Sequence, residues 1–286
     1  RFFLLGPVGR GGSGEVYRAK QAGLDRTVAI KVLASDLDDE EAKGLALRLK
    51  DEAMAASKVR HPGLVEVIDA GIDDQLGPYV AYEYLDGGTL EDWLGQQGPM
   101  AAKDVYLKFG KTMLNALSTL HNAGIVHRDI KPDNLVADSR GVFKLTDLGL
   151  ANFQGRQVRT KTGMVWGTPG YMAPERLRTP PPPAHPKQDI YAAAMMFVRA
   201  ISGRLPFKSK TLGAMFKEQL DKDISAERLL SLSIEPPLAK VLAKALHRSP
   251  KHRTSDAETL KKEIAKAIDA PKTAKLKPTK AARAPS

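Results

Sequence analysis

Residues 127–134 read His-Arg-Asp-Ile-Lys-Pro-Asp-Asn, and three of their side chains suit phosphoryl transfer. This reaction needs an in-line geometry, metal ions on the phosphates and a carboxylate beside the attacking hydroxyl. Asp129 is suited to accept the proton of a substrate hydroxyl, and Lys131 to place a point charge near the transferred group. Asn134 offers an oxygen ligand of the kind that Mg²⁺ prefers. Pro132 has no N–H and a fixed φ, so we predict a loop rather than a helix interior.

The same segment matches H-R-D-x-x-x-x-N and resembles the catalytic loop of the protein kinases. Lys131, two residues after Asp129, resembles the Ser/Thr-specific version of that loop. A charged, solvated loop is the plainer interpretation of one isolated match. The resemblance therefore depends on the elements that would hold ATP, the metal and this loop in place.

A glycine-rich segment near the start of the chain supplies the first of these elements. Gly9, Gly11 and Gly14 match G-x-G-x-x-G, and Val16 completes the form found in kinases. Glycines let backbone N–H groups come close to phosphate oxygens. The same spacing also marks dinucleotide-binding folds, which need a helix at the glycines, whereas residues 15–19 alternate as a strand does. We therefore predict a glycine loop between two strands.

The Val-Ala-Ile-Lys run at 28–31 resembles the strand that carries the ATP-contacting lysine of a kinase. The resemblance implies that Lys31 contacts the α- and β-phosphates and that Ala29 belongs to the cofactor-binding residues. No Walker motif is present, which excludes a P-loop enzyme.

A carboxylate should hold Lys31 in place, and the resemblance assigns this role to Glu52. Glu52 lies nine residues before a His-Pro pair, on a helix that periodicity predicts over residues 40–59. Glu41 and Asp51 are the alternatives on the same helix.

The Tyr-Glu-Tyr-Leu run at 82–85 resembles the hinge between the two lobes of a kinase. The backbone groups of Glu83 to Leu85 would then bind adenine, and Tyr82 would be a bulky gatekeeper at the rear of the pocket. An amphipathic stretch over 103–122 is predicted to be the core helix behind the catalytic loop.

Asp147-Leu148-Gly149 follows a strand predicted at 142–146 and resembles the metal-binding Asp-Phe-Gly of the family. Asp147 would bind the Mg²⁺ that bridges the phosphates. Leu148 departs from the usual Phe, but it is apolar and can fill the same packing role.

The segment that ends in Ala-Pro-Glu at 173–175 resembles an activation segment. Thr168 resembles the threonine that positions the catalytic aspartate and shapes a Ser/Thr substrate site. Thr160 and Thr162 are expected sites of autophosphorylation, with Arg128 as the partner of the phosphate. The alternative is that these two hydroxyls only keep the loop solvated.

Two structural roles complete the resemblance. Glu175 is expected to pair with Arg253, and Asp189 is expected to brace the backbone of the catalytic loop. A buried pair of this kind indicates a fixed geometry more than it indicates net stability.

The composition of the 286 residues is that of an ordinary soluble protein, with 27% charged residues. There is no Cys, which excludes a disulfide framework and a Cys-ligated metal site. The longest nearly apolar run, residues 191–198, is too short to span a membrane. Because the chain begins at Arg1 rather than Met, we expect a fragment of a longer protein.

The resemblance covers roughly residues 5 to 268 and implies an α+β, two-lobed protein kinase fold. We expect a five-stranded antiparallel lobe with one helix over 1–84 and a mainly helical lobe over 85–270. The basic, Ala/Pro/Lys-rich segment 271–286 is expected to be a disordered tail or linker, and specific binding of nucleic acid is not expected. The implied family is the Ser/Thr protein kinases, in particular the eukaryotic-like kinases of bacteria.

The implied activity is transfer of the γ-phosphoryl group of ATP to Ser or Thr of protein substrates, with Mg²⁺ or alternatively Mn²⁺. A homodimer would serve trans-autophosphorylation. We expect a cytoplasmic kinase domain that reaches a membrane only through flanking regions. A nucleotide-binding pseudokinase is the alternative, which the loss of Lys31, Asp129 or Asp147 would have favoured. A small-molecule kinase is disfavoured by the segment 168–175.

Overall fold

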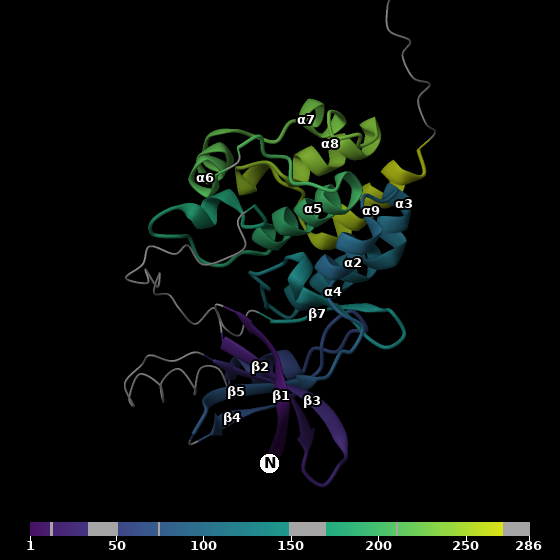
Figure 1. The fold of residues 1–286 in the computed structure, drawn as a ribbon. Coiled ribbons are helices and arrows are strands. Elements are labelled where there is room, and N and C mark those ends of the chain that lie inside the picture. Colours follow the sequence, from purple (N-terminus) through teal and green to yellow (C-terminus); the bar gives the residue numbers. More distant parts are fainter. Residues whose placement is uncertain (12–13, 34–50, 74, 149–169, 210, 271–286) are drawn as a thin grey trace, which may run out of the picture.

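The computed structural model describes residues 1–11, 14–33, 51–73, 75–148, 170–209 and 211–270. These residues form two lobes, a small one built on a β-sheet and a larger one built from helices (Figure 1). This arrangement confirms the predicted α+β class.

The small lobe is a five-stranded antiparallel sheet with the strand order β1-β2-β3-β5-β4. Its strands are β1 (Phe2–Gly11), β2 (Gly14–Gln21), β3 (Arg26–Leu33), β4 (Val67–Asp73) and β5 (Gly77–Glu83). Alternating apolar residues give the sheet a buried side, where Ala19, Val28, Ile30 and Ala81 pack together. The sheet thereby fixes the register of β3, in which Lys31 lies opposite Val16 on β2 and Val80 on β5.

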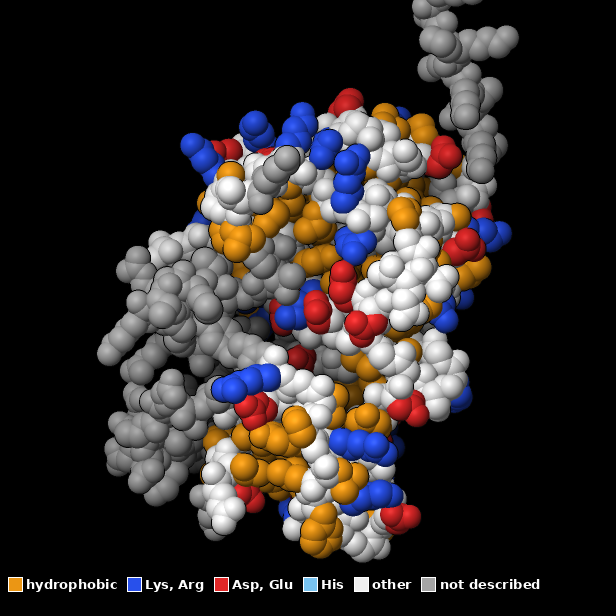
Figure 2. Space-filling model, in the orientation of Figure 1, with side chains coloured by type: hydrophobic (Ala, Val, Ile, Leu, Met, Phe, Trp, Pro, Cys, Tyr) orange, Lys and Arg blue, Asp and Glu red, His pale blue; other side chains and the backbone are white. Residues whose placement is uncertain are grey.

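Several apolar side chains of the small lobe are exposed (Figure 2). They include Phe3, Leu5 and Val8 of β1. Of the predicted helix of this lobe, residues 51–57 are described and are helical, with Ala53 and Ala56 buried against the core.

The large lobe is organised around α5, whose residues from Gln188 to Val198 are all buried. Such a helix, apolar on every side, must lie in the centre of a lobe. The helices of this lobe are α2 (Leu90–Gln97), α3 (Ala102–Val105), α4 (Lys111–Asn122), α5 (Pro186–Ser202), α6 (Leu212–Asp221), α7 (Ala226–Leu230), α8 (Pro236–Ala245) and α9 (Ala257–Ile268). Short turns of helix are η1 (Tyr106–Gly110), η2 (Pro132–Asn134), η3 (Pro174–Leu177) and η4 (Pro250–His252).

The predicted helix over 103–122 is present but contains a turn of π-helix, η1, between α3 and α4. Gly110 ends this turn and lies directly against Phe197 of α5, where an added Cβ would stand 2.3 Å from the ring. The close approach explains why this position requires glycine.

A two-stranded hairpin of β6 (Leu135–Ala137) and β7 (Phe143–Leu145) follows the catalytic loop. It also contacts the small lobe, because Leu145 accepts a hydrogen bond from Val65 N at 2.9 Å and donates to Gly63 O at 2.8 Å. The hairpin therefore lies where the two lobes meet.

Candidate active site

The β6–β7 hairpin brings Asn134 and Asp147 to the same end of its two strands. Leu135 pairs with Leu145, so Asn134 precedes one strand and Asp147 follows the other. Thr146 closes this end by donating its N–H to Asn134 O at 2.9 Å. Asp147 has a φ of 58°, a left-handed conformation that is unusual outside glycine and typical of functional positions.

The catalytic loop gathers its three predicted groups at one place. Asn134 donates from Nδ2 to the backbone oxygen of Asp129 at 2.8 Å and to its Oδ2 at 2.9 Å. Lys131 Nζ lies 3.4 Å from the same Oδ2. The Asp129 side chain remains 37% exposed, so its carboxylate is accessible to a hydroxyl group.

Asp189, near the start of α5, holds the backbone of this loop through hydrogen bonds. Its two carboxylate oxygens accept hydrogen bonds from His127 N and Arg128 N, each at 2.8 Å. His121 Nε2 lies 2.8 Å from Asp189 Oδ2 and is a partner that no pattern in the sequence predicted. The carboxylate is 1% exposed, so the loop rests on a buried charge that is satisfied by N–H groups.

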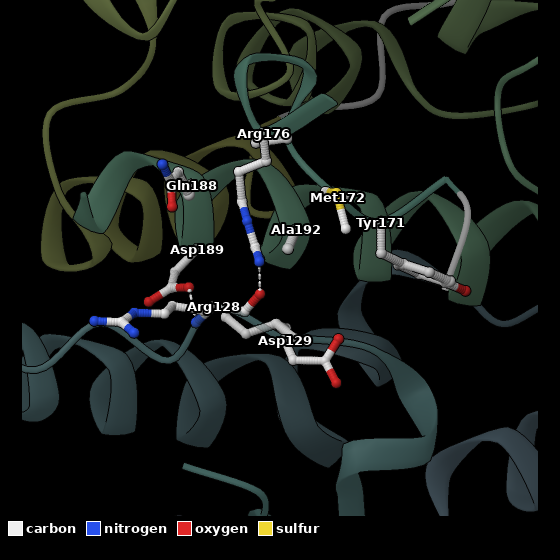
Figure 3. A pocket seen from close by; sticks show the side chains of 10 residues that line it. Arg128, Asp129, Tyr171, Met172, Arg176, Gln188, Asp189 and Ala192 are labelled. Atoms are coloured by element: carbon white, nitrogen blue, oxygen red, sulfur yellow. Dashed lines mark hydrogen bonds between the residues drawn. The ribbon is translucent and has the colours of Figure 1, made fainter. Parts of the chain in front are cut away.

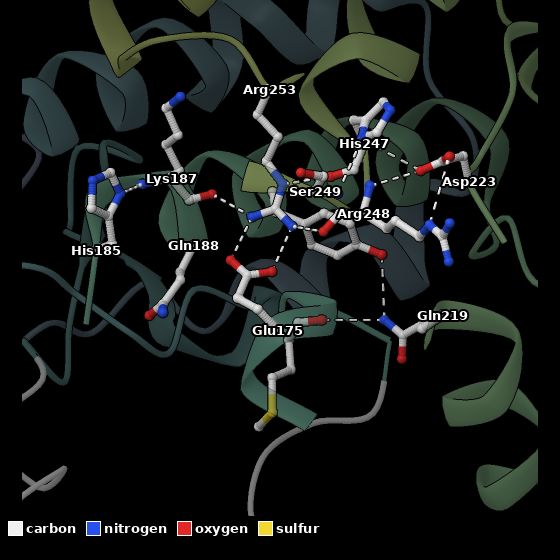
Figure 4. Close-up of polar contacts among 12 residues, drawn as sticks. Glu175, His185, Lys187, Gln188, Gln219, Asp223, His247, Arg248, Ser249 and Arg253 are labelled. Atoms are coloured by element: carbon white, nitrogen blue, oxygen red, sulfur yellow. Dashed lines mark hydrogen bonds and ion pairs between the residues drawn. The ribbon is translucent and has the colours of Figure 1, made fainter. Parts of the chain in front are cut away.

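Glu175 and Arg253 form the buried pair that the sequence predicted (Figure 4). The two bonds measure 2.7 and 2.6 Å, and the Arg253 side chain is 0% exposed. Arg253 also donates to three backbone oxygens, so all five of its N–H groups are used; these oxygens belong to Lys187, His247 and Arg248. The guanidinium packs over the ring of Tyr191 at 5.0 Å.

The predicted pairing of Lys31 with Glu52 is wrong in this structure. Lys31 Nζ lies 2.8 Å from Asp147 Oδ2 and is 5% exposed, and no ion pair joins it to Glu52 within the described residues. Glu52 is partly buried, which raises the pKa of its carboxyl, and the nearby charge of Arg128 lowers it in part. The physical reason is that the Lys31 ammonium pairs with Asp147, whereas the charge acting on Glu52 is that of Arg128.

The three glycines of the glycine loop differ in whether packing requires a glycine at their position. Gly14 has a φ of +137°, and an added Cβ would lie 2.0 Å from Val32 O, so packing of β2 on β3 demands glycine. A Cβ at Gly9 would meet nothing within 4 Å. Gly11 pairs with Gly14 at the end of the hairpin, and the binding roles of all three glycines stay predictions.

The predicted hinge residues lie beside these groups at the end of β5. Tyr82 is buried opposite Ala29, and burial together with the charge of Asp147 raises its pKa well above the usual value. The gatekeeper role of Tyr82 stays a prediction. Leu85 is partly buried and packs against the core.

Glu83 has a contact that sequence reasoning missed. Both of its carboxylate oxygens lie 2.8 Å from Lys144 Nζ on β7. Glu66 N donates to one of them at 2.8 Å, and Glu66 O accepts from Glu83 N at 3.0 Å. The side chain thus ties the end of β5 to the large lobe, and the backbone N–H of Glu83 is already used by Glu66 O.

The oxygen donors at this edge fit a divalent cation that is bound together with phosphates. Asn134 uses its N–H₂ group toward Asp129, which leaves its oxygen for a cation, and Asp147 adds a carboxylate. Within the described residues there is no cluster of three or more His, Asp or Glu that could hold a metal alone. Mg²⁺ suits such a sparse set, because it keeps water and phosphate oxygens among its six ligands.

Four predicted residues, Gly149, Thr160, Thr162 and Thr168, lie outside the described residues. The structure therefore brings together Lys31, Asp129, Lys131, Asn134 and Asp147, and it places Glu175, Asp189 and Arg253 beneath them. No helix in the described part of the chain has the length and apolar character needed to cross a membrane.

A small antiparallel sheet above a helical lobe, with a carboxylate, an amide and a lysine gathered between them, defines the protein kinase class of phosphotransferases. The family described as protein kinase domain matches residues 2–264, and this chain belongs to that family.

The curated relatives are named as bacterial serine/threonine-protein kinases. PrkC of Bacillus subtilis is 32% identical over 270 residues, which cover 94% of this chain and 41% of that protein. PknL of Mycobacterium tuberculosis is 32% identical over 257 residues, which cover 90% and 63%. PksC of Streptomyces coelicolor is 36% identical, with coverage of 92% and 48%. The chain thus spans about half the length of the curated relatives it matches.

The fold is also that of a solved structure, the kinase domain of Mycobacterium tuberculosis PknI. The TM-score is 0.71 at 24% sequence identity, over 94% of this chain and 96% of that one. At this identity the likeness concerns the fold alone.

Proposed function

We propose that this chain transfers the γ-phosphoryl group of MgATP to Ser or Thr hydroxyls of protein substrates. The observation that carries the proposal is the joint placement of Asp129, Asn134 and Asp147 around one edge of the β6–β7 hairpin. Membership of the protein kinase family and relatives named serine/threonine-protein kinases support the same reaction.

In this mechanism Asp129 orients the substrate hydroxyl and accepts its proton. Its Oδ2 already accepts a hydrogen bond from Asn134 and lies 3.4 Å from the Lys131 ammonium, whereas Oδ1 accepts no hydrogen bond from any described residue. We therefore propose that Oδ1 of Asp129 accepts the proton of the substrate hydroxyl. The Lys131 ammonium, held near this carboxylate, offsets the negative charge that develops on the transferred group.

Mg²⁺, when bound, neutralises the phosphate charge and aligns the transferred group for in-line attack. Asp147 and the Asn134 side-chain oxygen are the residues that would hold it. Lys31 is placed to bind the α- and β-phosphates, because its ammonium reaches the same edge from β3. The carbonyl of Glu83 and the backbone of Leu85 would bind adenine.

We further propose activation by phosphorylation at Thr160 or Thr162, with Arg128 as the phosphate partner. The buried Nε of Arg128 has no hydrogen-bond partner among the described residues, which supports an anion-binding role. Trans-autophosphorylation would require a transient homodimer. Attachment to a membrane would come from segments outside this chain, with the kinase domain on the cytoplasmic side.

The test is transfer of radiolabelled γ-phosphate to a generic basic protein, followed by phosphoamino-acid analysis. Wild type is compared with Asp129→Asn in Mg²⁺, in Mn²⁺ and in a chelator. We expect label on Ser and Thr that needs the metal and falls by about 10²- to 10⁴-fold in the variant, which is the usual contribution of a positioned general base. Binding of ATP without transfer by wild type would overturn the proposal.

Tandem mass spectrometry after incubation with ATP tests the activation step separately. Phosphate at position 160 or 162 is expected. An active enzyme that is unmodified at both threonines would contradict this part.

A further inference from the structure

Arg176 is a basic residue beside the catalytic loop to which the mechanism above gives no role. It directly follows Glu175 on the short helix η3, and its side chain extends from there toward the loop (Figure 3). Arg176 Nη1 donates a hydrogen bond to the backbone oxygen of Arg128. This oxygen belongs to the peptide bond that leads into Asp129.

The conformation of that peptide needs support. Arg128 has a φ of 71°, in the left-handed region that side chains other than glycine rarely adopt. A residue in this region persists where its surroundings hold it there. The N–H of Arg128 is held by Asp189 at 2.8 Å, and the oxygen of Asp129 by Asn134 at 2.8 Å. The oxygen of Arg128 lies between these two fixed groups and is held by Arg176.

The charge of Arg176 also acts on the site. Burial lowers the pKa of its guanidinium, and the negative charges of Asp129 and Asp189 act in the opposite direction. The guanidinium lies in a pocket formed by the catalytic loop, residues 171–173 and the start of α5. It is therefore a cation enclosed next to the carboxylate that is proposed to take the substrate proton.

The backbone from which the Arg176 side chain extends is itself held in place. Its neighbour Glu175 is bound through both carboxylate oxygens to the fully buried Arg253. A side chain that starts from a rigid helix turn can fix the position of its hydrogen-bond partner more tightly than one that starts from a free loop. A continuous line of contacts thus runs from Arg253 through Glu175 and Arg176 to the peptide before Asp129.

We propose that Arg176 is a positioning residue for Asp129. Through its hydrogen bond, Arg176 couples the end of the activation segment to the catalytic loop. The proposal rests on the proposed function, because it assumes that Asp129 takes part in phosphoryl transfer. It goes beyond that function because it gives η3, which lies outside the catalytic loop, a part in orienting the Asp129 carboxylate.

The test uses Arg176→Met, which removes the charge and the N–H groups, and Arg176→Lys, which keeps a charge but loses the planar fork. Arg178→Met is the matched control, since Arg178 is exposed at the end of the same helix turn. Intact-mass measurement verifies that all the proteins compared carry the same number of phosphates. The measurements are kcat and the KM values for ATP and a peptide.

For Arg176→Met we expect kcat to fall by about 10- to 100-fold, as a small misplacement of a reacting group would cause. The KM for ATP should stay within about twofold, because Arg176 does not reach the predicted nucleotide-binding residues. Arg176→Lys should recover part of kcat.

Equal kcat in wild type and Arg176→Met would overturn the inference. So would a fall in kcat accompanied by an equal rise in the KM for ATP, which would indicate a general disturbance of the site rather than a misplaced Asp129. If Arg176→Met does not fold, Arg176→Lys decides, because unaltered kcat in that variant contradicts a need for the planar fork. Failure of the proposed function is distinguishable, since wild type itself would then transfer no phosphate and Asp129→Asn would change nothing.

Discussion

Lys31 Nζ and Asp147 Oδ2 lie 2.8 Å apart, in a contact that joins strand β3 of the small lobe to the end of β7 in the large one. The contact places the two residues proposed to bind phosphate and metal side by side. It also leaves Glu52 without the lysine that was predicted as its partner. The Glu52 carboxylate is partly buried, and the charge of Arg128 offsets part of the resulting rise in its pKa.

The pH dependence of stability tests this arrangement through Glu52. Burial raises the pKa of Glu52 above its usual 4.5, so the folded protein binds more protons than the unfolded chain just above that pH. The stability from this group is therefore present below pH 4.5 and is lost as the pH rises through the folded pKa. Glu52→Gln should gain stability relative to wild type as the pH rises from about 4 to about 7.

Urea unfolding of both proteins at each pH measures this difference. Glu235→Gln is the control, because Glu235 is exposed, makes no side-chain cap at the start of α8 and forms no ion pair with any residue that the structure describes. A pair between Glu52 and Lys31 in solution would lower the pKa of the carboxyl. Glu52→Gln would then lose stability relative to wild type as the pH rises, and the arrangement described here would be wrong.

Lys31→Met should reduce phosphoryl transfer by about 10²- to 10³-fold, the usual loss when one charge-stabilising donor is removed from an active site. Steady-state kinetics and ATP binding by calorimetry measure the effect. Lys20→Met is the control on the neighbouring strand, because the Lys20 ammonium pairs with Asp25 at the surface. Full activity in Lys31→Met would show that Lys31 does not serve the phosphates.

Arg253→Met should lower the free energy of unfolding by about 3 to 5 kcal/mol, because it leaves the buried Glu175 carboxylate without a partner. Arg248→Met, at a half-exposed arginine nearby, is the control and should cost less. The double variant with Glu175→Met should lose less stability than the sum of the two single changes, since neither charge is then left alone. Additive losses in chemical denaturation would argue against a coupled pair.

Gly14→Ala should destabilise the protein by about 1 to 3 kcal/mol, because it forces a side chain into a left-handed conformation against Val32 O. Gly9→Ala should change stability by less than about 0.5 kcal/mol, since its Cβ would meet open space. Any loss of ATP affinity in Gly9→Ala would therefore report on phosphate binding alone. Equal stability losses in the two variants would contradict the difference in packing.

Spacing along the chain was enough to predict the parts of the site that lie close together in the sequence. Asp129, Lys131 and Asn134 fall within one short loop, so their spacing alone brought them near one another. Alternation of apolar residues likewise predicted a strand over residues 15–19, which is part of β2, because side chains on a strand point to opposite faces with a period of two residues.

Only the tertiary structure decided which distant side chains meet. Lys31 pairs with Asp147 rather than Glu52, Arg176 reaches a carbonyl 48 residues away, and His121 contacts Asp189 across 68 residues. Periodicity places a residue on a face of a helix or strand but leaves its side-chain direction and its distant neighbours open. Those depend on how the elements pack, because several carboxylates of the same type compete for one buried cation and geometry selects among them.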